Sequence, residues 1–350
     1  MILISGYYGY GNWGDEAVLA AICQDLVASG VPRSAICVLS GDPAKTEQWH
    51  QVRAMKRYDF GAIKQALNRS DLCLSGGGSL LQDSTSVRTI PYYLTIMEMA
   101  FATKTPVVIY GQGVGPVRCK LYQPWIRRVF HRATKVVLRD AASAALCGQW
   151  SIPSSLLTVT ADPVFGFQPS PPEFRQEPGI VINLRPYPRW EKQILDWVKF
   201  VRFLVSRYGQ RVDFVPLGPG DVQMGRRIEQ EVPELNIVTC QTWLEAMHQM
   251  QKYSACIAMR LHGLVFAALG GTWPMGLNYD PKVAAIAAQM GSPVVQLDQV
   301  LLLNEMVKVG DYTTFSRGLR SKVEYLHKKA LANRLLLTGV LNHLHIGGVR

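Results

Sequence analysis

The chain has 350 residues, of which 48% are hydrophobic and 18% charged, so it can bury large cores and is too long for one ordinary domain. Its net charge of +11 excludes an acidic protein and favours acidic partners, such as nucleic acid, a membrane surface, phosphorylated metabolites or an anionic glycan carrier. The seven cysteines are scattered without a CxxC pair, which favours reduced core thiols over disulfides or zinc ligands.

The first residues run directly into a glycine-rich loop, without the basic region, apolar stretch and cleavage site of a secretory signal. No apolar run reaches the roughly 18 residues that a membrane-spanning helix needs. We therefore expect a cytoplasmic protein, with at most a peripheral contact to the inner face of the cell membrane.

Short apolar or β-branched runs recur along the chain, and each is followed by a turn with Gly, Asp or Arg and then by a helical pattern. This alternation is typical of parallel βαβ units. We predict an α/β fold of two doubly wound Rossmann-like domains that face a central cleft, resembling the B type of glycosyltransferase. The expected strands are 2–5, 36–40, 72–75, 107–110, 136–138, 156–159, 180–183, 212–216, 237–239, 255–259, 275–279 and 294–297.

A proline-dense stretch between the two sets of strands excludes regular structure and suits a hinge. The predicted parts are an N-terminal Rossmann-like domain on the acceptor side, a proline-rich linker, a C-terminal Rossmann-like domain on the donor side, and a helical segment. They cover residues 1–165, 166–178, 179–315 and 316–350. Because open parallel sheets bind ligands beyond the carboxyl ends of their strands, the residues that follow each run are the functional candidates.

The loop after the first strand, GYYGYGNWGDE at 6–16, contains a GxGxxG pattern. A dinucleotide site also needs an acidic residue about 20 positions after the glycine motif. The best candidate, Asp42, lies too far along the chain, which disfavours a dinucleotide site. Asp15 and Glu16 instead suit the positive end of a helix that begins near Ala17. A tight turn with acidic capping and an acceptor-binding or catalytic loop both explain the motif. Its aromatic residues, on which sugar rings stack, favour the second.

Two further glycine-rich segments follow strands, SGGGSLLQD at 75–83 and GQGVGP at 111–116. Consecutive glycines let the backbone approach a ligand closely, and a helix that starts after Ser79 would point N–H groups at an anion. Close packing between strand and helix explains the same glycines.

Cations stand at two of the expected strand ends. Arg139 precedes Asp140, and this pair is either a local ion pair or a fork for a carboxylate or phosphate. Asp280 and Pro281 resemble an N-cap and a first helical residue, which places Lys282 in the first turn. A cation there opposes the helix dipole by about 0.3–1 kcal/mol, so an anion at that terminus would explain it, although a solvated lysine is the simpler alternative.

Arg260 and His262 form the strongest constellation, at the entry to an apolar helical run, residues 264–269. If the strand end stays extended, the two side chains point to the same side and place a fixed cation beside a titratable imidazole. A lone core histidine is the alternative.

Residues 120–132 alternate basic and apolar positions at helical spacing. They suit a solvated helix packed by its apolar face, or a helix that rests on an anionic membrane surface.

Seven motifs together, in this order, resemble the polysaccharide pyruvyl transferase family over roughly residues 1 to 300, and most closely its bacterial cell-wall polymer branch. They are GYGNWGDE at 9–16, SGGG at 75–78, GQGVGP at 111–116, RD at 139–140, TADP at 160–163, RLHG at 260–263 and YDPK at 279–282. Trp13 departs from the small or polar residue expected in the loop, which leaves the acceptor open.

The resemblance implies transfer of pyruvate, as a ketal, from phosphoenolpyruvate to a sugar, expected to be N-acetylmannosamine of a lipid-linked cell-wall glycan precursor. The implied donor-binding residues are Arg139, Arg260, Leu261, His262 and Lys282. The acceptor-binding residues are Tyr10, Asn12, Trp13 and Asp83. His262 would transfer protons, with Asp15, Glu16 or Asp83 as a second base.

The scheme needs no metal and no cofactor beyond phosphoenolpyruvate as the donor substrate, and no ligand cluster for a metal is visible in the sequence. The expected partners are phosphoenolpyruvate, a lipid-linked or polymeric glycan and an anionic membrane surface, without nucleic acid. A nucleotide-sugar-dependent glycosyltransferase is the alternative enzyme. A non-catalytic glycan- or nucleic-acid-binding module is disfavoured, because the motifs lie at strand ends and the aromatic residues are not interleaved with basic ones.

Overall fold

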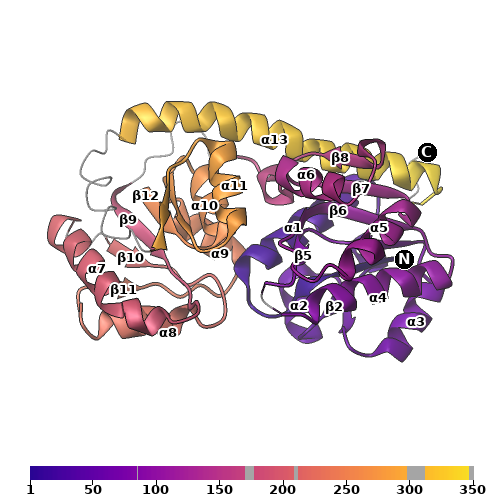
Figure 1. Ribbon diagram of the computed structural model, residues 1–350, viewed down its shortest axis with the longest axis horizontal. Helices are drawn as coiled ribbons and strands as arrows, with labels where there is room; N and C mark the ends of the chain where they lie inside the picture. The colour runs from indigo at the N-terminus through magenta and orange to yellow at the C-terminus, as the bar shows by residue number, and fades with distance from the viewer. Residues whose placement is uncertain (85, 170–176, 209–211, 298–311, 347–350) are drawn as a thin grey trace. The chain divides into compact units, whose positions relative to one another are not determined.

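A computed structural model of the protein describes residues 1–84, 86–169, 177–208, 212–297 and 312–346. The chain forms two compact units (Figure 1). The first unit comprises Met1–Tyr10, Asp15–Gly166 and the chain from His327 onward, and the second comprises Gly11–Gly14 and Phe167–Leu326. Most of the predicted proline-rich linker, residues 170–176, lies outside the described residues.

The first unit is built on a parallel sheet in the order β3-β2-β1-β4-β6-β7-β8, with β5 beside β6. Most of its strands are short runs buried on both faces, which is why they read as continuous apolar segments. The strands are β1 (Ile2–Tyr8), β2 (Ile36–Ser40), β3 (Arg53–Lys56), β4 (Leu72–Ser75), β5 (Gly78–Leu81), β6 (Val107–Val114), β7 (Lys135–Leu138) and β8 (Leu157–Val159).

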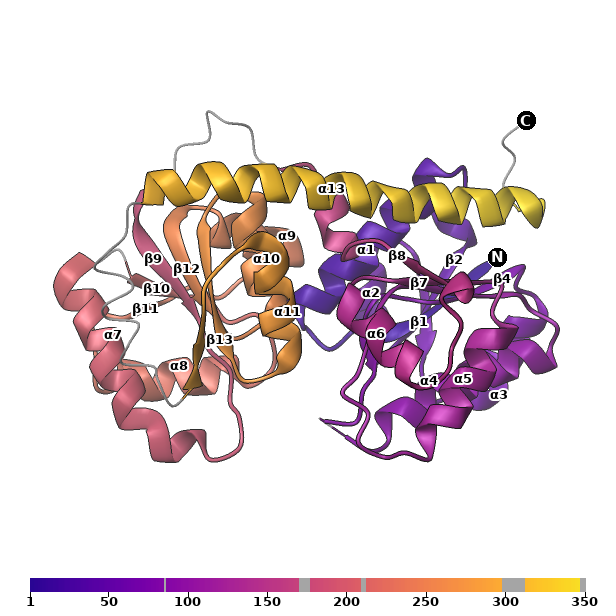
Figure 2. The ribbon, with the colours of Figure 1, turned by 45° about the horizontal axis from the view of Figure 1, so that its top comes forward.

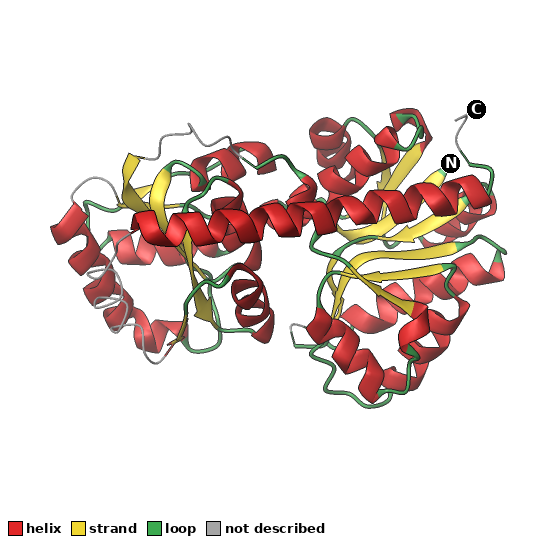
Figure 3. Ribbon diagram, turned by 90° about the horizontal axis from the view of Figure 1, so that it is seen from above, coloured by secondary structure: helices red, strands yellow, loops and turns green. Residues whose placement is uncertain are grey.

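Helices cover both faces of this sheet (Figure 3). They are α1 (Trp13–Ala28), α2 (Pro43–His50), α3 (Phe60–Asn68), α4 (Thr89–Ala102), α5 (Tyr122–Arg132) and α6 (Ala141–Gln149). Three of them begin at an aspartate whose side chain accepts a backbone N–H of the first turn, namely Asp42, Asp59 and Asp140.

The second unit repeats the same order of strands in a parallel sheet, β11-β10-β9-β12-β13-β14. Its strands are β9 (Glu177–Asn183), β10 (Val212–Phe214), β11 (Asn236–Ile237), β12 (Tyr253–Ala258), β13 (Trp273–Asn278) and β14 (Val294–Gln296). Its helices are α7 (Ile194–Tyr208), α8 (Asp221–Glu229), α9 (Trp243–Met250), α10 (Leu261–Leu269) and α11 (Pro281–Met290). Short 3₁₀ turns complete the two units at Arg33–Ala35, Ser154–Leu156, Pro163–Gly166 and Trp190–Gln193.

The strand order in both sheets is that of the doubly wound Rossmann fold. The predicted α/β class of two Rossmann-like domains is therefore confirmed. Every expected strand is present, but β3 and β5 were missed. The edge strand β3 has charged residues at both ends and no buried position, and β5 begins within the glycine run, so neither gives an apolar signal.

The C-terminal helix α13 (Tyr312–His343) is a single long element (Figure 2). Its second half belongs to the first unit. There Asn333 is fully buried, accepts the Thr160 hydroxyl at 2.5 Å and donates its amide to the Ala161 carbonyl at 3.1 Å. The helix predicted for the C-terminal segment is therefore present, and Asn333 joins it to Thr160 and Ala161, which follow β8. Within the described residues, no helix is both long and apolar enough to cross a membrane.

Asp25 on α1 is a buried acid whose removal should change the pH dependence of stability. The Tyr110 hydroxyl donates to its carboxylate. Burial raises the pKa of Asp25 to about 6, against the opposing effects of Tyr110 and Arg334. Because the folded-state pKa is raised, the stabilisation is present below the unfolded pKa near 3.8 and is lost as the pH rises through about 6.

Asp25→Asn keeps an acceptor for Tyr110 but cannot ionise. We expect the free energy of unfolding of the wild type to fall by about 2 kcal/mol more than that of Asp25→Asn when the pH is raised from about 4 to about 7.5. Urea unfolding at both pH values measures this difference. Equal shifts of the two proteins with pH would contradict it. Glu47→Gln, on the exposed surface of the same unit, is a control.

Candidate active site

Both sheets have a switch point, where the strand order reverses: between β1 and β4 in the first unit, and between β9 and β12 in the second. In open α/β sheets, ligands bind beside the carboxyl ends of the strands at such points. The two glycine motifs at 6–16 and 75–78 follow β1 and β4. Arg185 and Arg260 follow β9 and β12, so the two glycine motifs flank the first switch point and these two arginines flank the second.

Arg260 is held by a buried carboxylate. Its Nε and Nη2 atoms each lie 2.7 Å from an oxygen of Asp221, in a bidentate pair. Asp221 is fully buried and also accepts the Leu217 N–H at 3.0 Å and the Asn183 amide at 3.4 Å. Asn183 in turn accepts the backbone N–H of Arg260 at 3.2 Å. The guanidinium is therefore fixed in orientation, with its charge largely balanced before any ligand arrives.

Arg185 follows β9 and reaches across the sheet edge. Its Nη1 donates to the Tyr279 hydroxyl at 2.9 Å, and its guanidinium lies 5.1 Å from the centre of that ring. Tyr279 follows β13, and β9 and β13 both pair with β12 and not with each other. The contact therefore crosses the carboxyl end of β12, next to Arg260. Among the described residues, no carboxylate forms an ion pair with Arg185, in contrast to Arg260.

Lys282 adds a second cation beside Tyr279. Its Nζ lies 6.0 Å from the Tyr279 ring centre and 3.3 Å from an oxygen of Asp280, and a quarter of its side chain is exposed. The prediction that Asp280 caps α11 and that Pro281 is its first residue is confirmed, because the Asp280 side chain accepts the Lys282 N–H at 3.1 Å. Arg185 and Lys282 thus converge on one aromatic ring at a helix N-terminus, where anions are favoured.

His262 lies in the first turn of α10, and the premise of an extended strand end was wrong. β12 ends at Ala258, Arg260 is the N-cap of α10, and the helix begins at Leu261. The backbone is therefore helical at His262, and the strand alternation that the prediction assumed does not apply. The ring packs against Gly14 so closely that an added Cβ there would lie 2.2 Å from His262 Nδ1. The loop Gly11–Gly14 belongs to the second unit, and Trp13 donates its backbone N–H to Leu217 at 2.8 Å. Asn12 and Trp13 are thereby placed in the same unit as His262.

Arg139 lies in the first unit and is surrounded by its own partners. It is 4% exposed and contacts Asp162 at 3.1 Å, Asp140 at 3.3 Å and the Ser79 hydroxyl at 2.8 Å. A Cβ at Gly113 would lie 2.8 Å from its guanidinium. The ion-pair interpretation accounts for all of these contacts, and the donor-binding role of Arg139 stays a prediction.

The helix expected after Ser79 is absent. The glycine run leads instead into β5, and α4 begins only at Thr89, so the run does not open a helix. The glycines serve close packing: an added Cβ at Gly77 would meet Val18 at 2.7 Å. The carboxylate of Asp83 accepts the backbone N–H groups of Arg118 and Cys119 at 2.8–2.9 Å. Asp83 therefore holds the following loop.

The two acids of the first loop have different surroundings. Glu16 is fully buried, accepts the Gly9 N–H at 2.9 Å and lies 3.0 Å from His50 Nε2. Asp15 is half-buried in the first turn of α1. Tyr10 stacks on Tyr7 with ring centres 4.5 Å apart.

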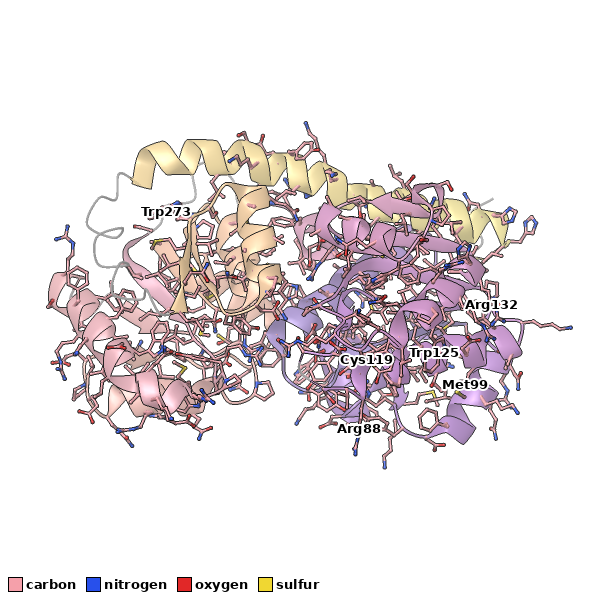
Figure 4. The ribbon with its side chains drawn as sticks, viewed as in Figure 1. Arg88, Met99, Cys119, Trp125, Arg132 and Trp273 are labelled. Atoms are coloured by element: carbon pink, nitrogen blue, oxygen red, sulfur yellow. The ribbon has the colours of Figure 1, made fainter. Side chains whose placement is uncertain are left out.

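The basic helix α5 packs by its apolar face on the first unit. Its residues Ile126, Val129 and Phe130 are buried. Both Arg128 and Arg132 contact Glu98 on α4, at 3.4 and 2.6 Å. Figure 4 shows Trp125 and Arg132 on α5 beside Met99 on α4.

Within the described ranges, no group of three or more His, Cys, Asp or Glu side chains is placed to hold a metal ion. The expectation that the reaction needs neither metal nor cofactor stays a prediction.

A family model described as polysaccharide pyruvyl transferase matches residues 12–281. The chain belongs to this family. It therefore belongs to a family of transferases, and the matched range contains Arg185 and Asp221 as well as the RLHG motif at 260–263. No curated protein matches the chain in sequence.

Solved structures similar to this pyruvyl transferase family member show its fold. The HepE protein of Anabaena in complex with UDP-glucose is 12% identical, with a TM-score of 0.64 over 98% of this chain and 99% of that chain. MnaA of S. aureus with UDP is 11% identical, with a TM-score of 0.65 over 99% and 96%. The UDP-GlcNAc 2-epimerase of Neisseria meningitidis bound to UDP-GlcNAc is 13% identical, with a TM-score of 0.62 over 98% and 100%. The glycosyltransferase-B-like architecture is thereby confirmed.

Two site residues of this family member, Arg185 and Asp221, escaped the sequence analysis. Arg185 lies two positions after a correctly predicted strand, so the rule that selected Arg139 and Arg260 would have found it. Asp221 gave no signal, because it starts α8 after a turn and resembles an ordinary helix-capping acid.

Proposed function

We propose that the protein transfers pyruvate from phosphoenolpyruvate to two hydroxyls of one sugar, forms a ketal and releases phosphate. The proposal is carried by Arg185 and Lys282, which converge on Tyr279, and by Arg260 and His262, which follow the neighbouring strand β12. Phosphoenolpyruvate carries a phosphate and a carboxylate on three carbons, so its site needs several cations close together.

Arg185, which forms no ion pair with a carboxylate among the described residues, and Lys282, which lies 3.3 Å from an oxygen of Asp280, supply charge for the donor. Arg260 contributes a fixed guanidinium edge, and the buried Leu261 holds the start of α10. The family resemblance also assigns Arg139 to the donor.

His262 carries the proton in this scheme. Protonation of the methylene carbon gives an oxocarbenium-like centre at C2, to which the first sugar hydroxyl adds with loss of its proton. The bond from C2 to the phosphate oxygen then breaks, and phosphate leaves with a proton. The second hydroxyl attacks C2, loses its proton and closes the ring. The two hydroxyl protons thus balance those gained by the methyl group and by phosphate.

The proposed acceptor is N-acetylmannosamine of a lipid-linked cell-wall precursor, and the proposed acceptor-binding residues are Tyr10, Asn12 and Trp13. Asp15, Glu16 or Asp83 is the proposed second base. The carboxylate of Glu16 lies 3.0 Å from His50 Nε2, and that of Asp83 accepts two backbone N–H groups.

We also propose a peripheral site of action at the cytoplasmic face of the membrane, where a lipid-linked acceptor would be found. Arg127 on α5 and Arg118 and Lys120 just before it are exposed and support this proposal, because each cation near an anionic surface adds about 1 kcal/mol.

Phosphate release from phosphoenolpyruvate tests the function. Purified protein is incubated with a lipid-diphosphate-linked aminosugar, and the glycan is analysed by mass spectrometry. Release that depends on the acceptor, with a mass gain of one pyruvate minus one water, is expected. The solved relatives hold UDP or UDP-sugars, so transfer from a nucleotide sugar with no phosphate release would favour the glycosyltransferase alternative instead.

Replacing Arg185 by methionine should raise the KM for phosphoenolpyruvate by about 10–100-fold, because one charge-assisted contact to the donor is lost. Steady-state kinetics with a fixed, saturating acceptor measures it. Arg226→Met, on the exposed side of α8 in the same unit, is the matched control. An unchanged donor KM in both variants would remove Arg185 from the site.

A further inference from the structure

Three exposed aromatic rings gather in one place on the first unit. Tyr7, Tyr58 and Phe60 are 40%, 64% and 44% exposed. Among the described residues, the only other strongly exposed large aromatic side chain is Tyr325 on α13. Gathered apolar rings on a surface indicate a contact with a ligand or partner, whereas rings scattered singly do not.

A buried arginine organises these rings from behind. Arg57 is 4% exposed, and its guanidinium lies within 6 Å of the centres of five tyrosine rings. Those rings belong to Tyr7, Tyr10, Tyr58, Tyr92 and Tyr93, at 5.9, 5.6, 5.3, 4.2 and 5.4 Å. A cation attracts the faces of aromatic rings, and more strongly where water is excluded. Arg57 therefore orients the rings while its own charge is kept away from the surface.

Ring-to-ring contacts fix the cluster further. Tyr7 and Tyr10 are stacked, with an angle of 16° between their planes, and the Tyr58 ring meets that of Tyr92 edge-on at 5.3 Å. Tyr92 also donates its hydroxyl to the Arg57 carbonyl at 2.8 Å. Pre-ordered rings lose little freedom when a ligand binds, which favours recognition by stacking.

The cluster lies where the fold places ligands. Tyr7 is the penultimate residue of β1, and Arg57 and Tyr58 directly follow β3, so the rings stand at the carboxyl edge of the first sheet. The strand between them, β2, leads to Gly41, which packs against Tyr10 so tightly that an added Cβ would lie 2.5 Å from its ring. The edge that carries the glycine loops thus continues into an aromatic surface.

We infer that Tyr7, Tyr58 and Phe60, with Tyr10 and Arg57 behind them, form a sugar-binding platform for the glycan acceptor. Sugar rings present flat C–H faces that stack on aromatic rings, and tyrosine hydroxyls bind their hydroxyl groups. A phosphate is disfavoured here, since the cation is buried beneath the rings. The inference rests on the proposed function, because it assumes that a glycan is the substrate.

The platform takes sugar residues of the acceptor, and the donor chemistry belongs to the second unit. Arg57 is a positioning residue, because it acts through the tyrosines. Weakening the platform should therefore affect the acceptor and leave the donor untouched.

The test uses Tyr58→Ala and the double variant Tyr7→Ala/Tyr58→Ala, with Tyr58→Phe as the conservative variant and Tyr325→Ala as the control. We expect the acceptor KM to rise about 3–10-fold for each ring removed, while the KM for phosphoenolpyruvate stays unchanged. Tyr325→Ala should stay within twofold of the wild type, whereas Tyr58→Phe, which keeps the ring and loses the hydroxyl, should raise the acceptor KM less than Tyr58→Ala does. Circular dichroism and thermal midpoints verify that each variant is folded.

A second measurement separates failure of the platform from failure of the proposed function. Saturation-transfer NMR with the disaccharide of N-acetylglucosamine as probe needs no donor. Contacts seen in the wild type and lost in the double variant would support the platform even if no phosphate is released. A probe that does not bind, or that binds the folded double variant equally well, would overturn it.

Discussion

Replacing Asp221 by alanine should lower the free energy of unfolding by about 3–5 kcal/mol, because Arg260 would keep a buried charge without its carboxylate. Asp221 is fully buried and also fixes Leu217 and Asn183, so two further groups lose an acceptor. Urea unfolding followed by tryptophan fluorescence measures the change, since Trp190 and Trp197 lie in the core of the same unit.

The pair also offers an internal check. In Asp221→Leu/Arg260→Met the buried charge is removed together with its partner, and much of the stability should return. Glu231→Ala is the control, because Glu231 pairs with Arg227 on the surface, where ion pairs contribute about 0–1 kcal/mol. A loss below about 1 kcal/mol for Asp221→Ala would mean that the site tolerates an unbalanced Arg260.

Replacing His262 by alanine should lower kcat by about 10²–10⁴-fold while leaving phosphoenolpyruvate binding largely intact, as expected for a proton-transfer group. His262 lies in the first turn of α10, and its ring packs on Gly14 of α1. Single-turnover phosphate release measures the chemistry, and titration calorimetry with phosphoenolpyruvate measures donor binding.

His248→Ala is the matched control, because His248 lies exposed on α9 of the same unit. Loss of donor binding in parallel with kcat would move His262 from proton transfer to binding. Unchanged kcat in a folded variant would remove it from the site altogether.

The sequence by itself determined the βαβ alternation, the expected strands and the family. Buried parallel strands are apolar on both faces, so their signal is local and survives without structural information. The same holds for the cap at Asp280, whose side chain bonds to a backbone N–H two residues away. Strand β3 escaped because an edge strand can be charged, and β5 because glycine gives no apolar signal.

Only the tertiary structure decided which charges are balanced. Arg139, Arg185 and Arg260 follow strands in the same way, yet Asp162 and Asp221 balance only the first and third. Those partners lie 23 and 39 positions away in the chain. The tyrosines around Arg57 likewise come from three separate segments. Long-range pairing and ring clustering depend on how strands are ordered in a sheet, and no short window of sequence contains that order.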